Sequence, residues 1–146
     1  MKSVIVYVST HHGNTKKVVD AISNELDVDV VDALNVDEIS LESYDLICFA
    51  SGIYGAKMHP KIIKFAEQNL PVGKKIAFIM TSALNKDFSK SMSGALEGKD
   101  AEVVGVYTCH GYNTFGPFKL VGGTSKGHPD EADLRAAVDF FRGISE

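Results

Sequence analysis

Short apolar runs and longer amphipathic stretches alternate along the chain. Five runs are rich in β-branched side chains and predict strands at Val4–Val8, Val28–Val31, Leu46–Ala50, Ile76–Met80 and Val103–Tyr107. Most of these runs are almost continuously apolar, which is typical of strands in a parallel sheet that helices cover on both faces.

Helical periods lie between and after the apolar runs. Spacings of three and four predict helices over Val18–Leu26, Ile62–Asn69 and Leu134–Phe141, with a weaker one over Phe88–Leu96. The flanking residues agree with these periods. We expect Asn14 to cap the first helix, Pro60 to open the next long one, and Asp130 to cap the last.

Strands that alternate with helices predict an α/β fold of three layers, α/β/α, with a parallel five-stranded sheet. No linker, repeat or low-complexity tract divides the chain, so we expect residues 1–146 to form one domain. One segment has no usable period: residues 109–129 are rich in glycine, and ordered loops of that length are uncommon unless they are functional.

Composition narrows the choice of partners. The formal net charge is −4, from 15 Lys+Arg and 19 Asp+Glu, and no basic block occurs, so we expect no nucleic-acid partner. The apolar runs are shorter than the roughly 20 residues that cross a bilayer, so we expect no membrane span and a cytoplasmic protein. Neither the two cysteines nor the five histidines show the spacing of a disulfide framework or a metal site.

The turn after the first predicted strand has the residues of a phosphate site. It consists of Ser9, Thr10, His11, His12, Gly13, Asn14 and Thr15. Its hydroxyls can donate to phosphate oxygens, Gly13 allows a tight turn, and the following helix adds its N-terminal amides and dipole. The nucleoside-triphosphate loop and the dinucleotide fingerprint are both absent. A phosphate monoester fits this turn, and an ordinary strand-to-helix turn is the alternative.

The run Tyr7-Val8-Ser9-Thr10, followed by Gly13-Asn14-Thr15 and an amphipathic helix, resembles the phosphate loop of the flavodoxin family. The length and element order of the whole chain resemble short flavodoxin-like proteins of anaerobic bacteria. The resemblance implies non-covalent binding of flavin mononucleotide (FMN) and a strand order of 2-1-3-4-5. The first and third strands would then be neighbours, with the ligand between the loops that follow them.

The resemblance also implies roles for two later loops. The first contains Ser51, Gly52, Ile53, Tyr54 and Gly55 and would cover one face of the isoalloxazine ring; the second contains Thr81, Ser82, Ala83, Leu84 and Asn85 and would hold its pyrimidine edge. Tyr54 or Ile53 would stack on the ring, although Tyr54 could equally be an exposed turn residue or a core residue. The second of these loops has no aromatic residue, which would leave the outer face of the flavin open.

The long segment 109–129 supplies the aromatic residues that the later loop lacks. We expect Tyr112, Phe115 or Phe118 to pack near the flavin rim or to form a docking surface; a surface loop that packs its own aromatics is the alternative. Separately, the expected ligand rim is less acidic than in most flavodoxins. Its basic and imidazole side chains are Lys57, His59, Lys61, Lys64 and Lys86.

Two related architectures are excluded by their missing residues. A receiver domain needs an Asp after the third strand, where Ala50 and Ser51 stand, and a small tyrosine phosphatase needs Cys-x5-Arg in the first turn. We therefore expect an FMN-binding electron carrier for redox partner proteins, a monomer or weak dimer without catalytic residues of its own.

An FMN-dependent reductase of a small substrate such as a quinone is the alternative function. Its proton donors would be sought among Tyr54, His59, His110 and Tyr112. A ligand-regulated interaction module is a third possibility, which only the long segment supports.

Overall fold

The computed structural model describes residues 1–10, 13–111 and 127–146. In chain order the elements are β1 (Ser3–Val8), α1 (Asn14–Glu25), β2 (Asp29–Asp32), β3 (Leu46–Tyr54), β4 (Lys57–Met58), α2 (Pro60–Asn69), β5 (Lys75–Ser82), the 3-10 helix η1 (Ser89–Met92), α3 (Ser93–Leu96), β6 (Glu102–His110) and α4 (Glu131–Ser145).

The strands form one sheet in the order β2-β1-β3-β5-β6, and all neighbours in that order run parallel. The predicted five-stranded parallel sheet and its order are confirmed, with β5 and β6 as the fourth and fifth of the predicted strands. The short strand β4 is an addition, because it folds back antiparallel on the end of β3. Gly55 and Ala56 make this turn with φ of 59° and 62°, as a two-residue hairpin loop requires.

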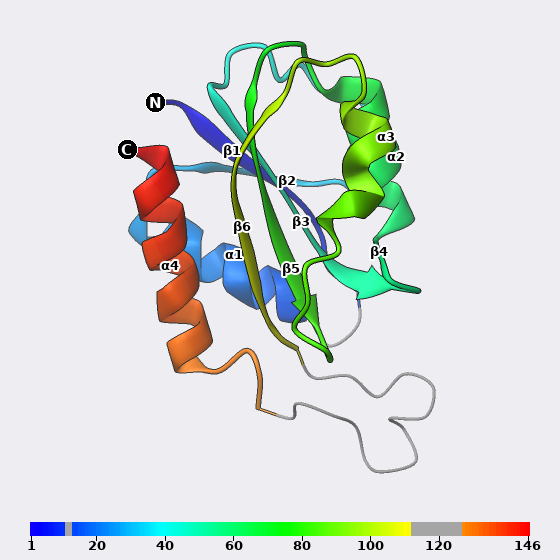
Figure 1. Ribbon diagram of the computed structural model, residues 1–146. Helices are drawn as coiled ribbons and strands as arrows, with labels where there is room; N and C mark the ends of the chain where they lie inside the picture. Colours follow the sequence, from blue (N-terminus) through cyan, green and yellow to red (C-terminus); the bar gives the residue numbers. More distant parts are fainter. Residues whose placement is uncertain (11–12, 112–126) are drawn as a thin grey trace.

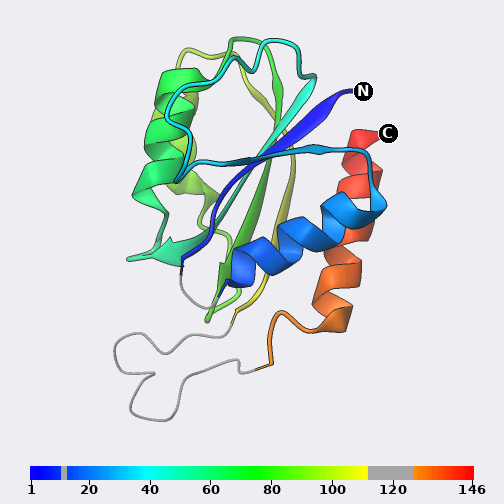
Figure 2. The same ribbon diagram turned by 180° about the vertical axis from the view of Figure 1, so that it is seen from behind.

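Helices cover both faces of the sheet, with α1 and α4 on one side and α2 and α3 on the other (Figures 1 and 2). Each strand therefore serves two cores. Val4, Val6 and Val8 of β1 pack in the cluster under α2 and α3, whereas Ile5 and Tyr7 pack in the cluster under α1 and α4. This division explains why the first predicted strand has no polar alternation.

Several element boundaries differ from the sequence prediction. Asn14 does not cap α1: it is the first helical residue, and Gly13 occupies the N-cap position. The weak helix predicted near Phe88 is split into η1 and one turn of α3, while β6 is longer than predicted and reaches His110. Within the described ranges, no helix has the length and apolarity that a membrane span needs.

Both cysteines belong to the core under α1 and α4. Cys48 is fully buried and Cys109 is 2% exposed. Burial raises the pKa of both thiols, that of Cys109 to about 12. Cys109 therefore packs in the interior as a neutral thiol.

Candidate functional site

The loops singled out in the sequence meet at one edge of the sheet. Because β1, β3, β5 and β6 are parallel, their carboxyl ends lie together, at the lower edge in Figure 1. The chain crosses from β1 to β2 on one side and from β3 to β5 on the other, so β1 and β3 flank the point where the connections diverge. In open α/β sheets, ligands bind at this point.

The first loop leaves the N-terminus of α1 without a negative side chain. Gly13 has φ of +64°, and a Cβ added there would meet nothing within 4 Å. The first turn of α1 contains no acidic residue. The cap comes from further back in the chain, because the Ser9 hydroxyl oxygen accepts a hydrogen bond from the Lys16 amide at 3.0 Å. The positive end of the helix dipole thus has a neutral hydroxyl beside it and no carboxylate in the first turn.

Thr15 ties the first loop to the third. Its hydroxyl oxygen lies 3.0 Å from that of Thr81, and both side chains are buried. Thr15 belongs to the first turn of α1 and Thr81 is the second-last residue of strand β5, so this bond holds the helix start against the sheet edge. Both residues were predicted for the site, but no pattern in the sequence indicates that they touch.

The end of β6 passes close to the same helix start. A Cβ added to Gly111 would lie 2.7 Å from Asn14 Nδ2, so any larger residue at 111 would require the Asn14 side chain to move. The Gly111 amide donates to the Ser82 carbonyl oxygen at 3.1 Å. Glycine at 111 therefore lets β6, the third loop and α1 converge.

Tyr54 joins the first loop to the second. Its hydroxyl is hydrogen-bonded to the Thr10 hydroxyl, and its ring meets the His59 ring edge-on with 4.9 Å between centroids. A Cβ added at Gly52 would lie 3.4 Å from the Tyr54 hydroxyl oxygen, so the tyrosine lies over the Gly52 backbone. Ile53 packs against the core instead. Of the two predicted stacking residues, Tyr54 is the one beside the first loop.

His59 caps helix α2. Its Nδ1 accepts a hydrogen bond from the Lys61 amide at 3.0 Å, and its own amide donates to the Ser51 hydroxyl oxygen at 3.1 Å. Burial, and then the charge of Lys61, lower the pKa of His59. A neutral imidazole that accepts at Nδ1 carries its proton at Nε2. The position of His59 directly before Pro60, the first residue of α2, is a sequence signal for a capping role that was overlooked.

The third loop contributes backbone and a single exposed apolar side chain. Asn85 has φ of +49°, and its amide donates to the Ser82 hydroxyl oxygen at 3.1 Å. His110 Nδ1 lies 3.2 Å from the Ala83 carbonyl oxygen. Leu84 is 59% exposed. This loop is therefore a folded turn that leaves one apolar residue on the surface.

Three side chains at the start of α4 could hold a metal ion by their spacing, but helix capping accounts for them. Ligand atoms of His128, Asp130 and Asp133 lie within 4.8 Å of one another. Asp130 and Asp133 form a reciprocal capping box, and His128 Nδ1 lies 2.7 Å from Asp133 Oδ2. The Asp133 hydrogen bond raises the pKa of His128. Burial raises the pKa of Asp133, but its hydrogen bonds with His128 and Asp130 outweigh this and lower it.

Some predicted residues lie outside the described part of the chain. They are His11 and His12 of the first loop and Tyr112, Phe115 and Phe118 of the long segment. The remaining residues predicted for the three loops lie at or just beyond the carboxyl ends of β1, β3 and β5. The capping role of Ser9 had no sequence signal, because its partner is the amide of Lys16, seven positions away.

Comparison with known proteins identifies the family. Residues 4–110 match the family profile described as flavodoxin domain. An uncharacterized protein of Methanocaldococcus jannaschii is 42% identical over 151 residues, which cover 99% of this chain and 98% of that protein. Oxidised flavodoxin 2 of Bacillus cereus has a TM-score of 0.68 at 19% identity, with 99% of this chain and 98% of that chain covered.

The flavodoxin of Fusobacterium nucleatum, solved bound to flavin mononucleotide, has a TM-score of 0.62 at 15% identity and covers 99% of this chain and 98% of its own. These two structural likenesses show a shared fold. Because the family profile spans most of the sequence, the chain belongs to the flavodoxin family.

Proposed function

We propose that the protein binds FMN between its three loops and carries electrons, one at a time, between redox proteins. The observation that carries the proposal is the start of α1. There the Gly13 turn and the neutral hydroxyls surround a helix N-terminus whose first turn has no acidic residue. The residues proposed to bind FMN are Ser9, Thr10, His11, His12, Gly13, Asn14, Thr15, Ser51, Gly52, Ile53, Tyr54, Gly55, Thr81, Ser82, Ala83, Leu84 and Asn85.

The donor set fits the phosphate group of FMN. A phosphate monoester carries nearly two negative charges and needs several donors, which hydroxyls and helix-start amides supply without a cation. Ser9, Thr10 and Thr15 supply hydroxyls, and the open space beside Gly13 leaves room for the anion. A carboxylate in this turn would repel the phosphate, and the turn contains none.

The second and third loops suit a flat ring. Bound FMN supplies the redox chemistry, and the chain binds and orients it. Tyr54 offers an aromatic face beside the first loop, and a stacking contact of that kind is worth about 1 kcal/mol. The Ser82 hydroxyl accepts from the Asn85 amide and keeps its own hydrogen available for a carbonyl oxygen of the ring.

The direct test is purification followed by anaerobic reductive titration. We expect a yellow protein that releases FMN, rather than riboflavin, on denaturation. We also expect reduction in two spectrally distinct one-electron stages, with electrons passed on to protein acceptors. A colourless protein that stays colourless after incubation with FMN would overturn the proposal.

An FMN-dependent reductase is the second candidate, and the third loop favours it. Residues 81–87 contain no aromatic side chain, and Leu84 is exposed, so a planar substrate such as a quinone could stack over the flavin. In that case reduction would proceed in one two-electron stage, with rapid turnover of a soluble quinone. If the protein reduces quinone slowly but passes electrons quickly to a one-electron protein acceptor, the electron-carrier function is favoured.

We propose that residues 1–146 act as one such domain, although the family profile ends at residue 110. Val138 and Phe141 of α4 share a core cluster with Val18 and Ile22 of α1. Removal of α4 would uncover that cluster, so a chain truncated after residue 110 is expected to lose cooperative unfolding in a thermal melt.

A further inference from the structure

Beside the proposed flavin site, an exposed apolar spot is bordered by lysines. Tyr54 at the end of β3 is 37% exposed, and Leu84 in the third loop is 59% exposed. Their strands are neighbours, with Gly52 opposite Thr81, so Tyr54 and Leu84 both follow adjacent strand ends at the carboxyl edge. Lys57, Lys86 and Lys90 follow in the adjoining segments and are all exposed. We call these five residues the lysine-bordered patch.

Contacts between the segments hold the patch together. The Met58 amide in β4 donates to the Ser91 hydroxyl oxygen in η1 at 3.0 Å, which joins the segments of Lys57 and Lys90. Met58 and Met92 are buried in the same cluster beneath them. Lys57 and Lys90 therefore lie on anchored segments, and a preformed surface of this kind loses less conformational entropy on binding.

The charge of the patch is opposite to that of the whole chain. The formal net charge is −4, yet residues 51–58 and 81–92 contain three lysines and a single carboxylate, Asp87. That carboxylate accepts a hydrogen bond from the Ser89 amide at 2.8 Å. Among the described residues, no carboxylate forms an ion pair with Lys57, Lys86 or Lys90, whereas Lys61 is paired with Asp37 at 3.1 Å.

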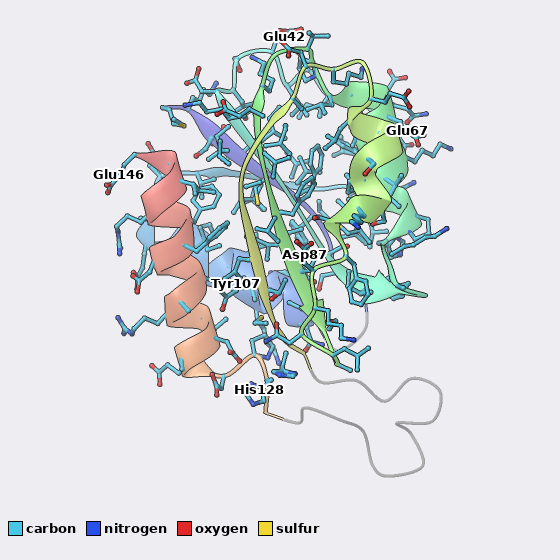
Figure 3. All side chains as sticks on the ribbon, in the orientation of Figure 1. Glu42, Glu67, Asp87, Tyr107, His128 and Glu146 are labelled. Carbon is cyan, nitrogen blue, oxygen red and sulfur yellow. The ribbon has the colours of Figure 1, made fainter. Side chains whose placement is uncertain are left out.

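Acidic side chains gather at the opposite edge of the sheet, where the strands begin. Figure 3 shows Glu42 at that edge, far from Asp87 in the segment of the patch. The acidic side chains outnumber the lysines of that edge and include Glu25, Asp27, Glu42, Glu97, Asp100 and Glu102. On the lower edge, Asp130, Glu131 and Asp133 at the start of α4 limit the basic region on the β6 side. The molecule thus has a basic patch beside the site and an acidic far end.

We infer that the lysine-bordered patch docks a redox protein whose own electron-transfer site has an acidic border. The inference rests on the proposed function, because it names the partner of that site. The lysine-bordered patch has an apolar centre and a charged border, as transient protein interfaces do. Complementary charge steers and orients such encounters, and beyond about 8 Å physiological salt screens the acidic far end.

The test compares two one-electron acceptors of opposite charge, the acidic protein plastocyanin and the basic protein cytochrome c. The FMN-loaded, reduced protein is mixed with each, and the transfer rate is followed from about 20 mM to about 300 mM salt. For plastocyanin we expect a rate that falls about tenfold with salt, and for cytochrome c a rate that stays flat or rises. The reverse pattern would mean that net charge governs docking and would overturn the inference.

Matched charge reversals locate the surface. Lys57→Glu with Lys90→Glu removes two patch lysines, and Lys75→Glu with Lys99→Glu makes the same charge change at the opposite edge. At low salt we expect the first pair to slow transfer to plastocyanin about tenfold and the second to change it less than twofold. Equal effects of the two pairs would contradict a local docking site.

A binding measurement separates this inference from the proposed function. Plastocyanin added to the isotope-labelled protein, with or without FMN, should shift the backbone amide signals of Lys57, Leu84 and Lys90. If plastocyanin causes these shifts but the protein does not bind FMN, the carrier function alone is refuted. FMN binding without these shifts would refute the docking surface alone. A different outcome is that the protein sediments with phosphatidylglycerol vesicles through the same lysines and shows no shifts with plastocyanin. That outcome would identify a membrane surface and overturn the inference.

Discussion

Helices α1 and α4 both begin at the carboxyl edge of the sheet, and their first turns differ in charge. The first turn of α4 contains Glu131 and Asp133, and Asp130 completes a capping box with Asp133. The first turn of α1 has no acidic residue, and its N-cap is a glycine without a side chain. Carboxylates already neutralise the helix dipole in α4, whereas in α1 the dipole and amides can act on an external anion.

Helix α2 shows a third arrangement. Pro60 at its start has no amide hydrogen to satisfy, and His59 accepts the hydrogen bond of the Lys61 amide. Its N-terminus is therefore closed without charge. Of these three helix starts, only that of α1 combines a first turn without acidic residues with a left-handed glycine at the N-cap position, which is why we propose it as the anion site.

The largest predicted effect comes from giving α1 the charge that α4 has. Gly13→Asp places a carboxylate at the helix start, and Gly13→Asn is the uncharged control, because both residues tolerate positive φ. We expect Gly13→Asp to bind FMN about a hundredfold more weakly than Gly13→Asn, about 2.7 kcal/mol, through repulsion of the phosphate. Fluorescence titration measures this, and riboflavin affinity should not differ between the two variants.

A smaller effect is expected from the hydroxyl pair of Thr15 and Thr81. Thr15→Val and Thr81→Val both break their 3.0 Å hydrogen bond, so each should cost about 1 kcal/mol of unfolding free energy. Only Thr15→Val removes a proposed phosphate donor. We expect it to weaken FMN about tenfold with little change for riboflavin. Equal losses of FMN and riboflavin in Thr15→Val would show that Thr15 does not act on the phosphate.

Removal of the α4 capping box is expected to lower the stability of the fold without changing the affinity for FMN. Asp130→Ala removes the capping box and should lower the free energy of unfolding by about 1 kcal/mol. Asp139→Ala is the control. It removes an acid of the same helix whose ion pair with Arg142 lies at the surface, so the free energy of unfolding should change by less than about 0.5 kcal/mol. Urea denaturation measures both, and FMN affinity should stay the same in each.

The smallest effect is a pH dependence at the start of α4. The Asp133 hydrogen bond raises the pKa of His128 above its usual 6.5. A raised histidine pKa means that the folded state binds the proton more tightly, so this stabilisation is present below about pH 6.5 and is lost as pH rises through the folded-state pKa. Thermal melts should show that His128→Gln lowers Tm more at pH 6 than at pH 9. A constant difference across that range would contradict the charge pair.

Periodicity predicted the fold in detail because this sheet is buried on both sides. The continuous apolar runs at Val4–Val8 and Leu46–Ala50 are needed only where helices pack on both faces, so they indicated a parallel sheet directly. The hairpin of β4 was missed, because Ala56 in the left-handed turn gives no sign of positive φ. The cap of α1 was misassigned to Asn14, since the local pattern could not show that Gly13 and Ser9 share that role.

Within the site, sequence reasoning selected the loops but not their contacts. Thr15 and Thr81 are far apart in the chain, as are Thr10 and Tyr54, and hydrogen bonds at such separations leave no local pattern. His59 was considered as a proton donor, and the structure adds that its Nδ1 accepts the Lys61 amide hydrogen, which leaves Nε2 as the nitrogen that carries the proton.

The sequence by itself determined which segments become strands and helices, and that a hydroxyl-rich turn with Gly13 precedes the first helix. These properties depend on residues close together in the chain. Only the tertiary structure decided that Gly111 packs against Asn14, that Tyr54 lies beside the first loop, and that lysines from two connections lie at one edge of the sheet. Those properties depend on which strands become neighbours, and pairing in the sheet brings together residues that no local pattern relates.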